Sequence, residues 1–181
     1  MKWGTIKLGD VMDVKHGYAF KSKYFANTGP YVLLSPGNCH ESGGLKLKGD
    51  KEKYYTGDFP DEYLLRAGDI LVVMTDLINQ APILGGSFVI PEDDKYLHNQ
   101  RLGLVTIHDE SRIDRSFLFY LLNTEAYRGQ IRGSASGATV RHTSPDRIKR
   151  CEVRVPLNVG YQSRIASILS AYDDLIENNN R

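Results

Sequence analysis

Residues 161–179 read YQSRIASILSAYDDLIENN, and their apolar side chains recur at the spacing of one helix face. Steps of four and three residues connect six positions in this stretch: Tyr161, Ile165, Ile168, Tyr172, Leu175 and Asn179. This spacing predicts a long amphipathic helix over residues 158–181, and it also permits a coiled-coil seam formed by these six residues. Because the pattern covers fewer than three heptads, packing of the helix on its own domain remains the alternative.

The chain that precedes this helix begins with strand signals. Up to about residue 108, glycine and proline turn signals separate short apolar runs, of which residues 69–74 and 102–107 are the clearest strands. We therefore expect the N-terminal part to be mainly β, with short strands and long loops.

After residue 108 the signals are those of short helices. Helix starts are expected where a polar side chain can cap the first turn: Asp114 or Ser116, Thr124 and Ser144. A small-residue loop is expected over 133–139 and a strand over 151–155. Together these signals predict an α+β fold, with one domain over residues 1–157 and the helix over 158–181.

The composition is that of an ordinary globular protein. The chain has 181 residues, of which 41% are hydrophobic and 25% charged, enough for one domain with a sizeable core. No apolar run approaches the roughly 18 residues needed to span a bilayer, and the start of the chain lacks the apolar core of a signal peptide. Two cysteines, Cys39 and Cys151, make no disulfide framework. A cytoplasmic protein without a membrane partner is expected.

The net charge of +1 conceals an uneven distribution of basic residues. Between Arg112 and Arg154 the chain has nine basic and four acidic residues, and eight of the nine bases are arginine. The planar guanidinium fork suits phosphates and guanine edges, so this stretch is a candidate DNA face. A solvated, salt-bridged surface is the alternative interpretation.

Several loops contain side chains suited to DNA. Residues 133–139 offer backbone N–H groups and hydroxyls for phosphates, and the amides near residues 79 and 99 can pair with adenine. An ordinary turn is the alternative for each loop. The candidate DNA-binding residues are Lys21, Ser22, Lys23, Thr75, Asn79, Gln80, Arg101, Arg132, Ser134, Ser136, Thr139, Arg141 and His142.

Motifs for catalysis are scarce. The sequence has no phosphate-binding glycine loop, no nucleophile elbow and no zinc spacing among its five histidines, so no catalytic or metal-binding residue is assigned. One pattern, Pro60-Asp61 followed by Asp93-Asp94-Lys95, resembles the metal-binding motif of Mg²⁺-dependent nucleases. It is short and its spacing is permissive. A DNA nuclease therefore stays an alternative, as does a non-catalytic protein-docking domain.

Taken together, several segments resemble the specificity subunit of type I restriction–modification enzymes. The most specific match is Gln162-Ser163-Arg164-Ile165-Ala166 with Leu169–Asn179, and the second is Gly17-Tyr18-Ala19-Phe20-Lys21-Ser22. The other matching segments are Trp3 with Leu8-Gly9-Asp10, Gly29-Pro30-Tyr31, Ala67-Gly68-Asp69-Ile70-Leu71, His98-Asn99-Gln100-Arg101 and Val155-Pro156-Leu157. The resemblance covers essentially the whole chain.

The resemblance implies a function in DNA recognition without catalysis. Such subunits carry two target recognition domains, each of which reads one half of a split DNA sequence, and antiparallel helices fix the spacing between them. They direct methyltransferase subunits, which use S-adenosylmethionine, and a restriction subunit, which uses ATP and Mg²⁺. By this resemblance the chain itself needs no cofactor. Its partners are double-stranded DNA, those subunits, and a second recognition domain or a second copy paired through the C-terminal helix.

The chain departs from the family pattern in length. One recognition domain and the start of one spacer helix are present, and the helical pattern is still running at Arg181. We expect this helix to be cut short, as in a natural half-subunit, an expression fragment or a truncated product. Recognition domains vary in order to read different sequences, so the candidate DNA contacts rest on residue chemistry alone.

Overall fold

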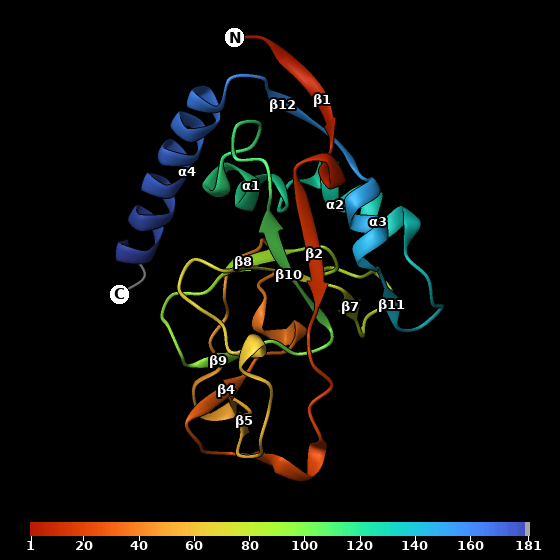
Figure 1. The fold of residues 1–181 in the computed structure, drawn as a ribbon, viewed down its shortest axis with the longest axis vertical. Helices are drawn as coiled ribbons and strands as arrows, with labels where there is room; N and C mark the ends of the chain where they lie inside the picture. The colour runs from red at the N-terminus through yellow and green to blue at the C-terminus, as the bar shows by residue number, and fades with distance from the viewer. Residues whose placement is uncertain (180–181) are drawn as a thin grey trace.

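The computed structural model describes residues 1–179, which form a mixed α/β fold (Figure 1). The strands are β1 (Trp3–Lys7), β2 (Met12–His16), β3 (Phe25–Ala26), β4 (Tyr31–Leu33), β5 (Tyr54–Tyr55), β6 (Ile70–Val73), β7 (Thr75–Asp76), β8 (Ser87–Val89), β9 (Tyr96–Leu97), β10 (Leu102–Ile107), β11 (Arg141–His142) and β12 (Glu152–Pro156). The helices are α1 (Arg115–Leu121), α2 (Glu125–Ser134), α3 (Pro145–Arg150) and α4 (Val159–Asn179). Short 3-10 turns are η1 (Leu8–Asp10), η2 (Ser22–Tyr24), η3 (Pro36–Asn38), η4 (Gly49–Lys51) and η5 (Asp61–Tyr63).

The central element is a four-stranded sheet in the order β2-β10-β6-β8, antiparallel throughout. The residues of strand β6 show that this sheet is buried on both faces. Ile70 and Val72 point into one core cluster, with the helices α1 and α2, whereas Leu71 and Val73 point into a second cluster on the opposite face. Alternate side chains of a strand point to opposite faces, so a continuous apolar run fits a sheet that is covered on both sides.

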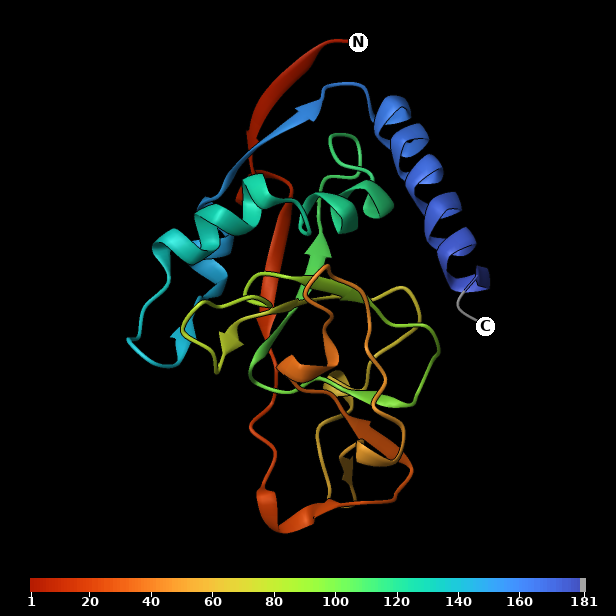
Figure 2. The same cartoon turned by 180° about the vertical axis from the view of Figure 1, so that it is seen from behind.

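Two smaller layers cover this sheet. The four-stranded sheet β3-β5-β4-β9, in which β4 and β9 run parallel, lies below it in Figure 1. Figure 2 shows α1 and α2 on the opposite side, above the sheet. The helix starts agree with the sequence: Asp114, Thr124 and Ser144 accept hydrogen bonds from the backbone N–H groups of the first turns of α1, α2 and α3. Side-chain oxygens at these positions satisfy N–H groups that the helix leaves unpaired.

One loop boundary differs from the prediction. The small-residue segment expected as a loop over 133–139 begins inside α2, which continues through Ser134. The Ser134 hydroxyl donates to the carbonyl of Gln130 at 2.9 Å, a bond that a serine makes readily within a helix. The loop is therefore shorter and starts at Ala135.

A two-stranded ribbon, β1 with β12, leads into α4, the last element described. Gln162 holds the start of α4, because its amide donates to the carbonyls of Arg112 (3.0 Å) and Pro156 (2.8 Å) and accepts from Asp114 N–H (2.8 Å). The rest of the helix runs along the side of the domain (Figures 1 and 2). In residues 1–179 there is no helix both long enough and apolar enough to cross a membrane. Residues 180 and 181, the end of the expected 158–181 segment, lie outside the described residues.

Candidate nucleic-acid interface

Backbone hydrogen bonds join the predicted DNA-binding segments at one end of the central sheet. Strands β2 and β6 end there and β10 begins there, because β10 is antiparallel to both. Met74 connects two segments directly: its N–H donates to the carbonyl of Arg101 at 2.9 Å, and its carbonyl accepts from Thr143 N–H at 3.0 Å. We call this end the loop edge and define it by its segments 17–23, 74–80, 99–101 and 132–143.

The segments 17–23 and 99–101 meet through a close backbone approach. Tyr18 N–H donates to the carbonyl of His98 at 2.9 Å, and Gln100 N–H donates to the carbonyl of Tyr18 at 3.0 Å. A Cβ on Gly17 would lie 2.2 Å from the carbonyl oxygen of Asn99, so only glycine fits there. This contact explains the glycine in the 17–22 motif, and the turn then extends away from the sheet toward η2 (Figure 1).

His98 lies beneath this junction and is fully buried. Its Nε2 is 2.9 Å from the carbonyl of Leu102, and its Nδ1 has no partner among residues 1–179. Burial lowers the pKa of His98 to about 4, although the Leu102 carbonyl acts in the opposite direction. The ring is therefore neutral at physiological pH, and its bond to Leu102 fixes the loop whose His98 carbonyl accepts from Tyr18.

The segment 74–80 is organised by a buried carboxylate. Asp76 is 1% exposed, and its two oxygens accept from Ile78 N–H at 3.0 Å and from Ile83 N–H at 2.8 Å. This arrangement folds residues 77–83 into a compact loop. Asn79 and Gln80, which were predicted to read bases, lie exposed at its tip.

The segment 132–143 joins the same edge through β11, which pairs with β7 in the register Arg141 with Asp76 and His142 with Thr75. A hydrogen bond of 3.1 Å connects the Thr75 hydroxyl and Nδ1 of His142. The Arg141 guanidinium donates to the carbonyl of Arg132 at 3.0 Å, at the last turn of α2. Arginine here also compensates the negative end of the helix dipole.

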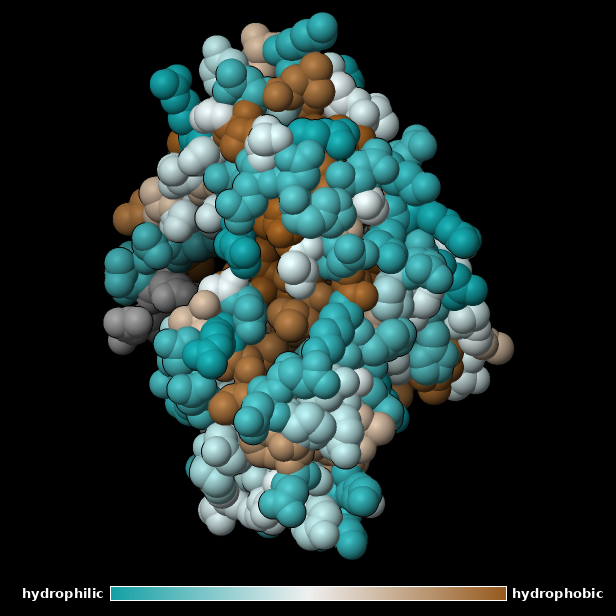
Figure 3. All heavy atoms as spheres, in the orientation of Figure 1, coloured by the Kyte–Doolittle hydropathy of each residue, from teal (hydrophilic) through white to brown (hydrophobic). Residues whose placement is uncertain are grey.

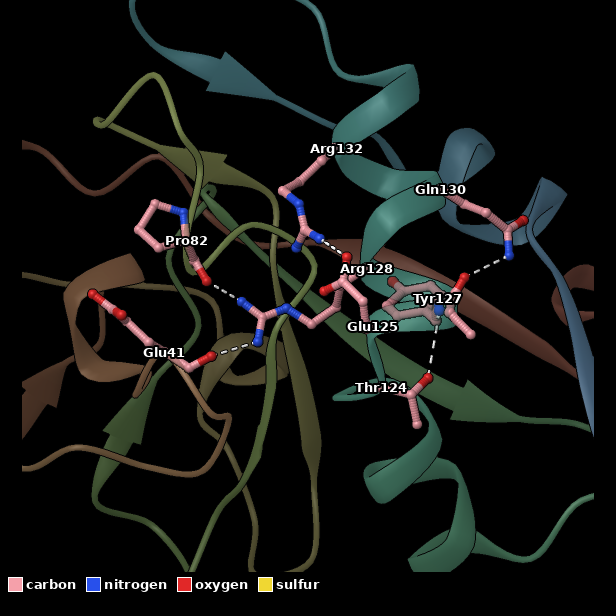
Figure 4. Close-up of polar contacts among 9 residues, drawn as sticks. Glu41, Pro82, Thr124, Glu125, Tyr127, Arg128, Gln130 and Arg132 are labelled. Carbon is pink, nitrogen blue, oxygen red and sulfur yellow. Dashed lines mark hydrogen bonds and ion pairs between the residues drawn. The ribbon is translucent and has the colours of Figure 1, made fainter.

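Arg128, which the sequence analysis counted only as part of the arginine-rich stretch, has a structural role beside this site that was not predicted. It is 6% exposed, and its guanidinium donates to the carbonyls of Glu41 and Pro82 (Figure 4). Burial lowers the pKa of this guanidinium. The side chain thus connects α2 to the loop that begins at Asp76. One signal was present in the sequence: Arg128 stands three residues before Ile131, on the apolar side of a predicted helix.

The predicted side chains differ in exposure. Thr75 is buried, whereas Arg132, which pairs with Glu125, and Arg141 are half-buried. The exposed members of the predicted set are Lys21, Ser22, Lys23, Asn79, Gln80, Arg101, Ser134, Ser136, Thr139 and His142. These ten come from all four segments of the loop edge.

The expectation that the arginine-rich stretch forms one DNA face is wrong. Arg112 and Arg115 lie beside α4, where the Arg112 carbonyl accepts from Gln162. Arg128 is buried, and Arg154 is exposed on the β1–β12 ribbon, at the opposite end of β2 from the loop edge (Figure 1). Arginines that are close in the sequence lie on different strands and helices, so the local net charge does not predict a single basic surface.

The helix α4 leaves most of its apolar side chains exposed. Of the six predicted seam residues, Ile165 packs against the core of the domain, whereas Tyr161, Ile168, Tyr172, Leu175 and Asn179 are exposed. A groove of about 610 Å³ runs between α4 and the domain and is lined by α1, β6 and β8. Figure 3 shows the molecule hollowed beside α4, with apolar atoms in the gap.

The nuclease-like pattern is not assembled as a metal site. Asp93 accepts from Ala67 N–H at 2.9 Å, and Lys95 pairs with Glu92 at 2.6 Å on the surface of a turn. Among residues 1–179 no three His, Cys, Asp or Glu side chains come together in a way that could hold a metal ion. Both thiols are buried, and burial raises the pKa to about 12 for Cys39 and about 11 for Cys151, so neither is a nucleophile near neutral pH.

Comparisons with known proteins agree with this architecture. The "MjaVIII" type I restriction enzyme specificity subunit of Methanocaldococcus jannaschii is 26% identical over 97% of this chain and 40% of its own length. The EcoBI specificity subunit of Escherichia coli is 28% identical over 78% of this chain and 26% of its own length. The crystal structure of the S subunit of a type I restriction-modification system from M. genitalium superposes with a TM-score of 0.69 at 19% identity, over 98% of this chain and 41% of that one.

The chain therefore spans less than half the length of each of these relatives. The model of the type I restriction modification DNA specificity domain matches residues 1–181, which is the whole sequence. That match covers both the loop edge and the helix α4. The chain belongs to the family of type I restriction modification DNA specificity domains.

Proposed function

We propose that this chain is a sequence-specific DNA recognition unit of a type I restriction–modification system and has no catalytic activity of its own. The observation that carries the proposal is the loop edge: four segments far apart in the sequence, each predicted to contact DNA, are joined there by backbone hydrogen bonds. The family match supports the same function. Residues 1–157 would read one half of a split target, and residues 158–181 would begin the spacer helix.

In this proposal the cationic side chains contact phosphates and the amide side chains contact bases. Lys21, Lys23, Arg101 and Arg141 would neutralise phosphates and place the domain on the duplex. Asn79 and Gln80, on their ordered loop, would read base edges. Such contacts need no bound cofactor. S-adenosylmethionine, ATP and Mg²⁺ belong, in this proposal, to the methyltransferase and restriction subunits that the chain directs to the target.

The decisive experiment is selection from a random duplex library, with this chain and the methyltransferase subunit present together. We expect recovery of a short conserved half-site, repeated at a fixed spacing if two copies bind. Recovery of no conserved sequence, with binding that disappears at moderate salt, would reject sequence-specific recognition. Mg²⁺-dependent cleavage of the duplex by the isolated chain, abolished by Asp61→Ala, would instead support the nuclease alternative.

Arg141→Ala is expected to weaken binding to the selected duplex and to reduce the slope of log affinity against log salt by about 1, because one phosphate contact is lost. The measurement is a salt titration of the dissociation constant. Arg154→Ala is the matched control, since this arginine belongs to the same arginine-rich stretch but lies on the β1–β12 ribbon. An unchanged slope for Arg141→Ala would remove Arg141 from the phosphate contacts.

The exposed stripe of α4 supports a second part of the proposal, a helix seam. Ile168 and Leu175 are 60% and 58% exposed, which favours burial against a second helix from another copy or another recognition domain. The double substitution Ile168→Lys and Leu175→Lys is expected to abolish dimerisation, measured by sedimentation, while the domain keeps its unfolding temperature. Dimers that persist in this variant would contradict the seam. Ser163→Lys, on the groove side of α4, is the control for added charge.

A further inference from the structure

Two aliphatic side chains project from the loop edge at the tip of the 77–83 loop. Leu77 is 62% exposed and Ile78 is 52% exposed, beside the exposed amides of Asn79 and Gln80. A single exposed leucine on a protein surface needs no explanation. Leu77 and Ile78 are adjacent and lie beside the exposed amides of the same loop, so they form an exposed apolar pair that needs an explanation.

The fold prevents this tip from collapsing onto the domain. Asp76 fixes the loop at both ends through Ile78 N–H and Ile83 N–H. Ala81 is buried and has a φ of 52°, a left-handed conformation that is unfavourable for a residue other than glycine. The Arg128 guanidinium holds the carbonyl of Pro82 from the other side. The loop is therefore held in one conformation, in which Ile83 packs against the core and Leu77 and Ile78 stay in water.

The surroundings of the tip are cationic. Arg141 lies directly across from Asp76 in the β7–β11 pair, and Arg147 donates to the Ser136 hydroxyl at 2.9 Å on the same segment. Asp76, the only acidic residue of segment 74–80, is buried and its oxygens are occupied by the loop backbone, and Glu125 is paired with Arg132. Apolar side chains on a strand-and-loop segment that pairs with an arginine-bearing strand match a DNA duplex, in which stacked apolar base faces lie between two rows of phosphates. They match less well an acidic or a purely apolar protein surface.

We propose that Leu77 and Ile78 form a wedge that inserts between neighbouring base pairs, partly unstacks one base step and kinks the duplex. This inference rests on the proposed function. Leucine and isoleucine wedges of this kind occur in proteins that bend DNA, where the deformation has a cost of a few kcal/mol that depends on the base step. The wedge thus makes the flexibility of one step part of the recognised sequence, in addition to the base edges that Asn79 and Gln80 contact.

The test measures bending and affinity on the same samples. Duplexes recovered from the random library are labelled with a donor and an acceptor dye at their two ends, and energy transfer is recorded with the full chain and the methyltransferase subunit. We expect the wild type to raise energy transfer above that of free duplex. Leu77→Ser with Ile78→Ser should return it to the free value and weaken binding about tenfold, as expected for the loss of buried aliphatic surface.

Two controls separate the wedge from a general surface effect. Leu47, 57% exposed, lies in a separate hollow beside Tyr54 and Tyr96, so Leu47→Ser should change neither readout. Leu77→Met keeps an apolar side chain and should retain the kink. Because Leu77 and Ile78 are exposed, the double serine variant should also keep the unfolding temperature of the wild type.

The outcomes distinguish the wedge from the function on which it rests. Tight, sequence-specific binding of the wild type to an unbent duplex overturns the wedge and leaves the recognition function intact. Absence of duplex binding by the wild type rejects both. A third outcome also overturns the wedge: the wild type leaves the duplex unbent, and the double serine variant no longer binds the methyltransferase subunit. This outcome would assign Leu77 and Ile78 to a contact with that subunit.

Discussion

Arg128→Ala is expected to destabilise the protein by about 3–5 kcal/mol, because it leaves buried carbonyls unpaired and opens a cavity. The carbonyls are those of Glu41 and Pro82, to which the guanidinium donates. DNA affinity should fall as well, since the loop that begins at Asp76 loses its contact with α2. Urea denaturation measures the first effect and a salt-matched binding titration measures the second.

Arg132→Ala provides a matched control on the same helix. Arg132 pairs with Glu125, whose side chain is 80% exposed, and exposed ion pairs contribute only about 0–1 kcal/mol. A second variant, Arg128→Met, keeps most of the side-chain volume and isolates the two hydrogen bonds from the cavity. If Arg128→Ala unfolds at the same urea concentration as Arg132→Ala, the assignment of Arg128 as a buried connection between α2 and the loop is wrong.

Gly17→Ala should have an effect of similar size, about 3 kcal/mol or more, because the added Cβ clashes with backbone atoms that cannot move independently. It would lie 2.2 Å from the carbonyl oxygen of Asn99 and 2.6 Å from that of His98. Relief of this clash separates residues 17–23 from residues 99–101 and breaks the hydrogen bond from Tyr18 N–H to His98. We expect a large drop in the unfolding temperature and loss of sequence-specific DNA binding.

The control for Gly17→Ala is Gly133→Ala. A Cβ at Gly133 meets no atom within 4 Å, and this glycine lies in the last turn of α2. Alanine there should stabilise the protein by up to about 1 kcal/mol, since glycine is a poor helix former. Wild-type stability and DNA affinity in Gly17→Ala would show that the two segments do not depend on their close approach.

The sequence predicted local structure well where the signal was local. The caps Asp114, Thr124 and Ser144 and the strand 102–107 were recognised because a capping side chain and a buried strand both leave short-range patterns. The end of α2 was misplaced because glycine and serine in a last helical turn resemble the start of a loop. Whether such residues are helical or form a loop depends on the surrounding tertiary structure, which a short sequence window does not contain.

The site was predictable only in part. Residue chemistry selected loops that the structure brings to one edge, yet it grouped Arg112, Arg128 and Arg154 as if neighbours in sequence were neighbours in space. Long-range antiparallel pairing decides which loops meet, and no short window contains that information. The buried role of Arg128 was not predicted for the same reason, since its partners are 87 and 46 residues away. The exposure of Leu77 and Ile78 was not predicted, because it depends on the bonds that Asp76 makes to the backbone of Ile78 and Ile83.

The connections through Met74 use only peptide groups: its N–H bonds to Arg101 and its carbonyl to Thr143. Peptide groups are the same at every position, so the attachment of these loops places no demand on side chains at their tips. Substitutions at Asn79, Gln80 and Thr139 are therefore expected to leave this backbone pairing intact. Under the proposed function, a lineage of such proteins would acquire new target sequences by point substitution, through intermediates that all fold.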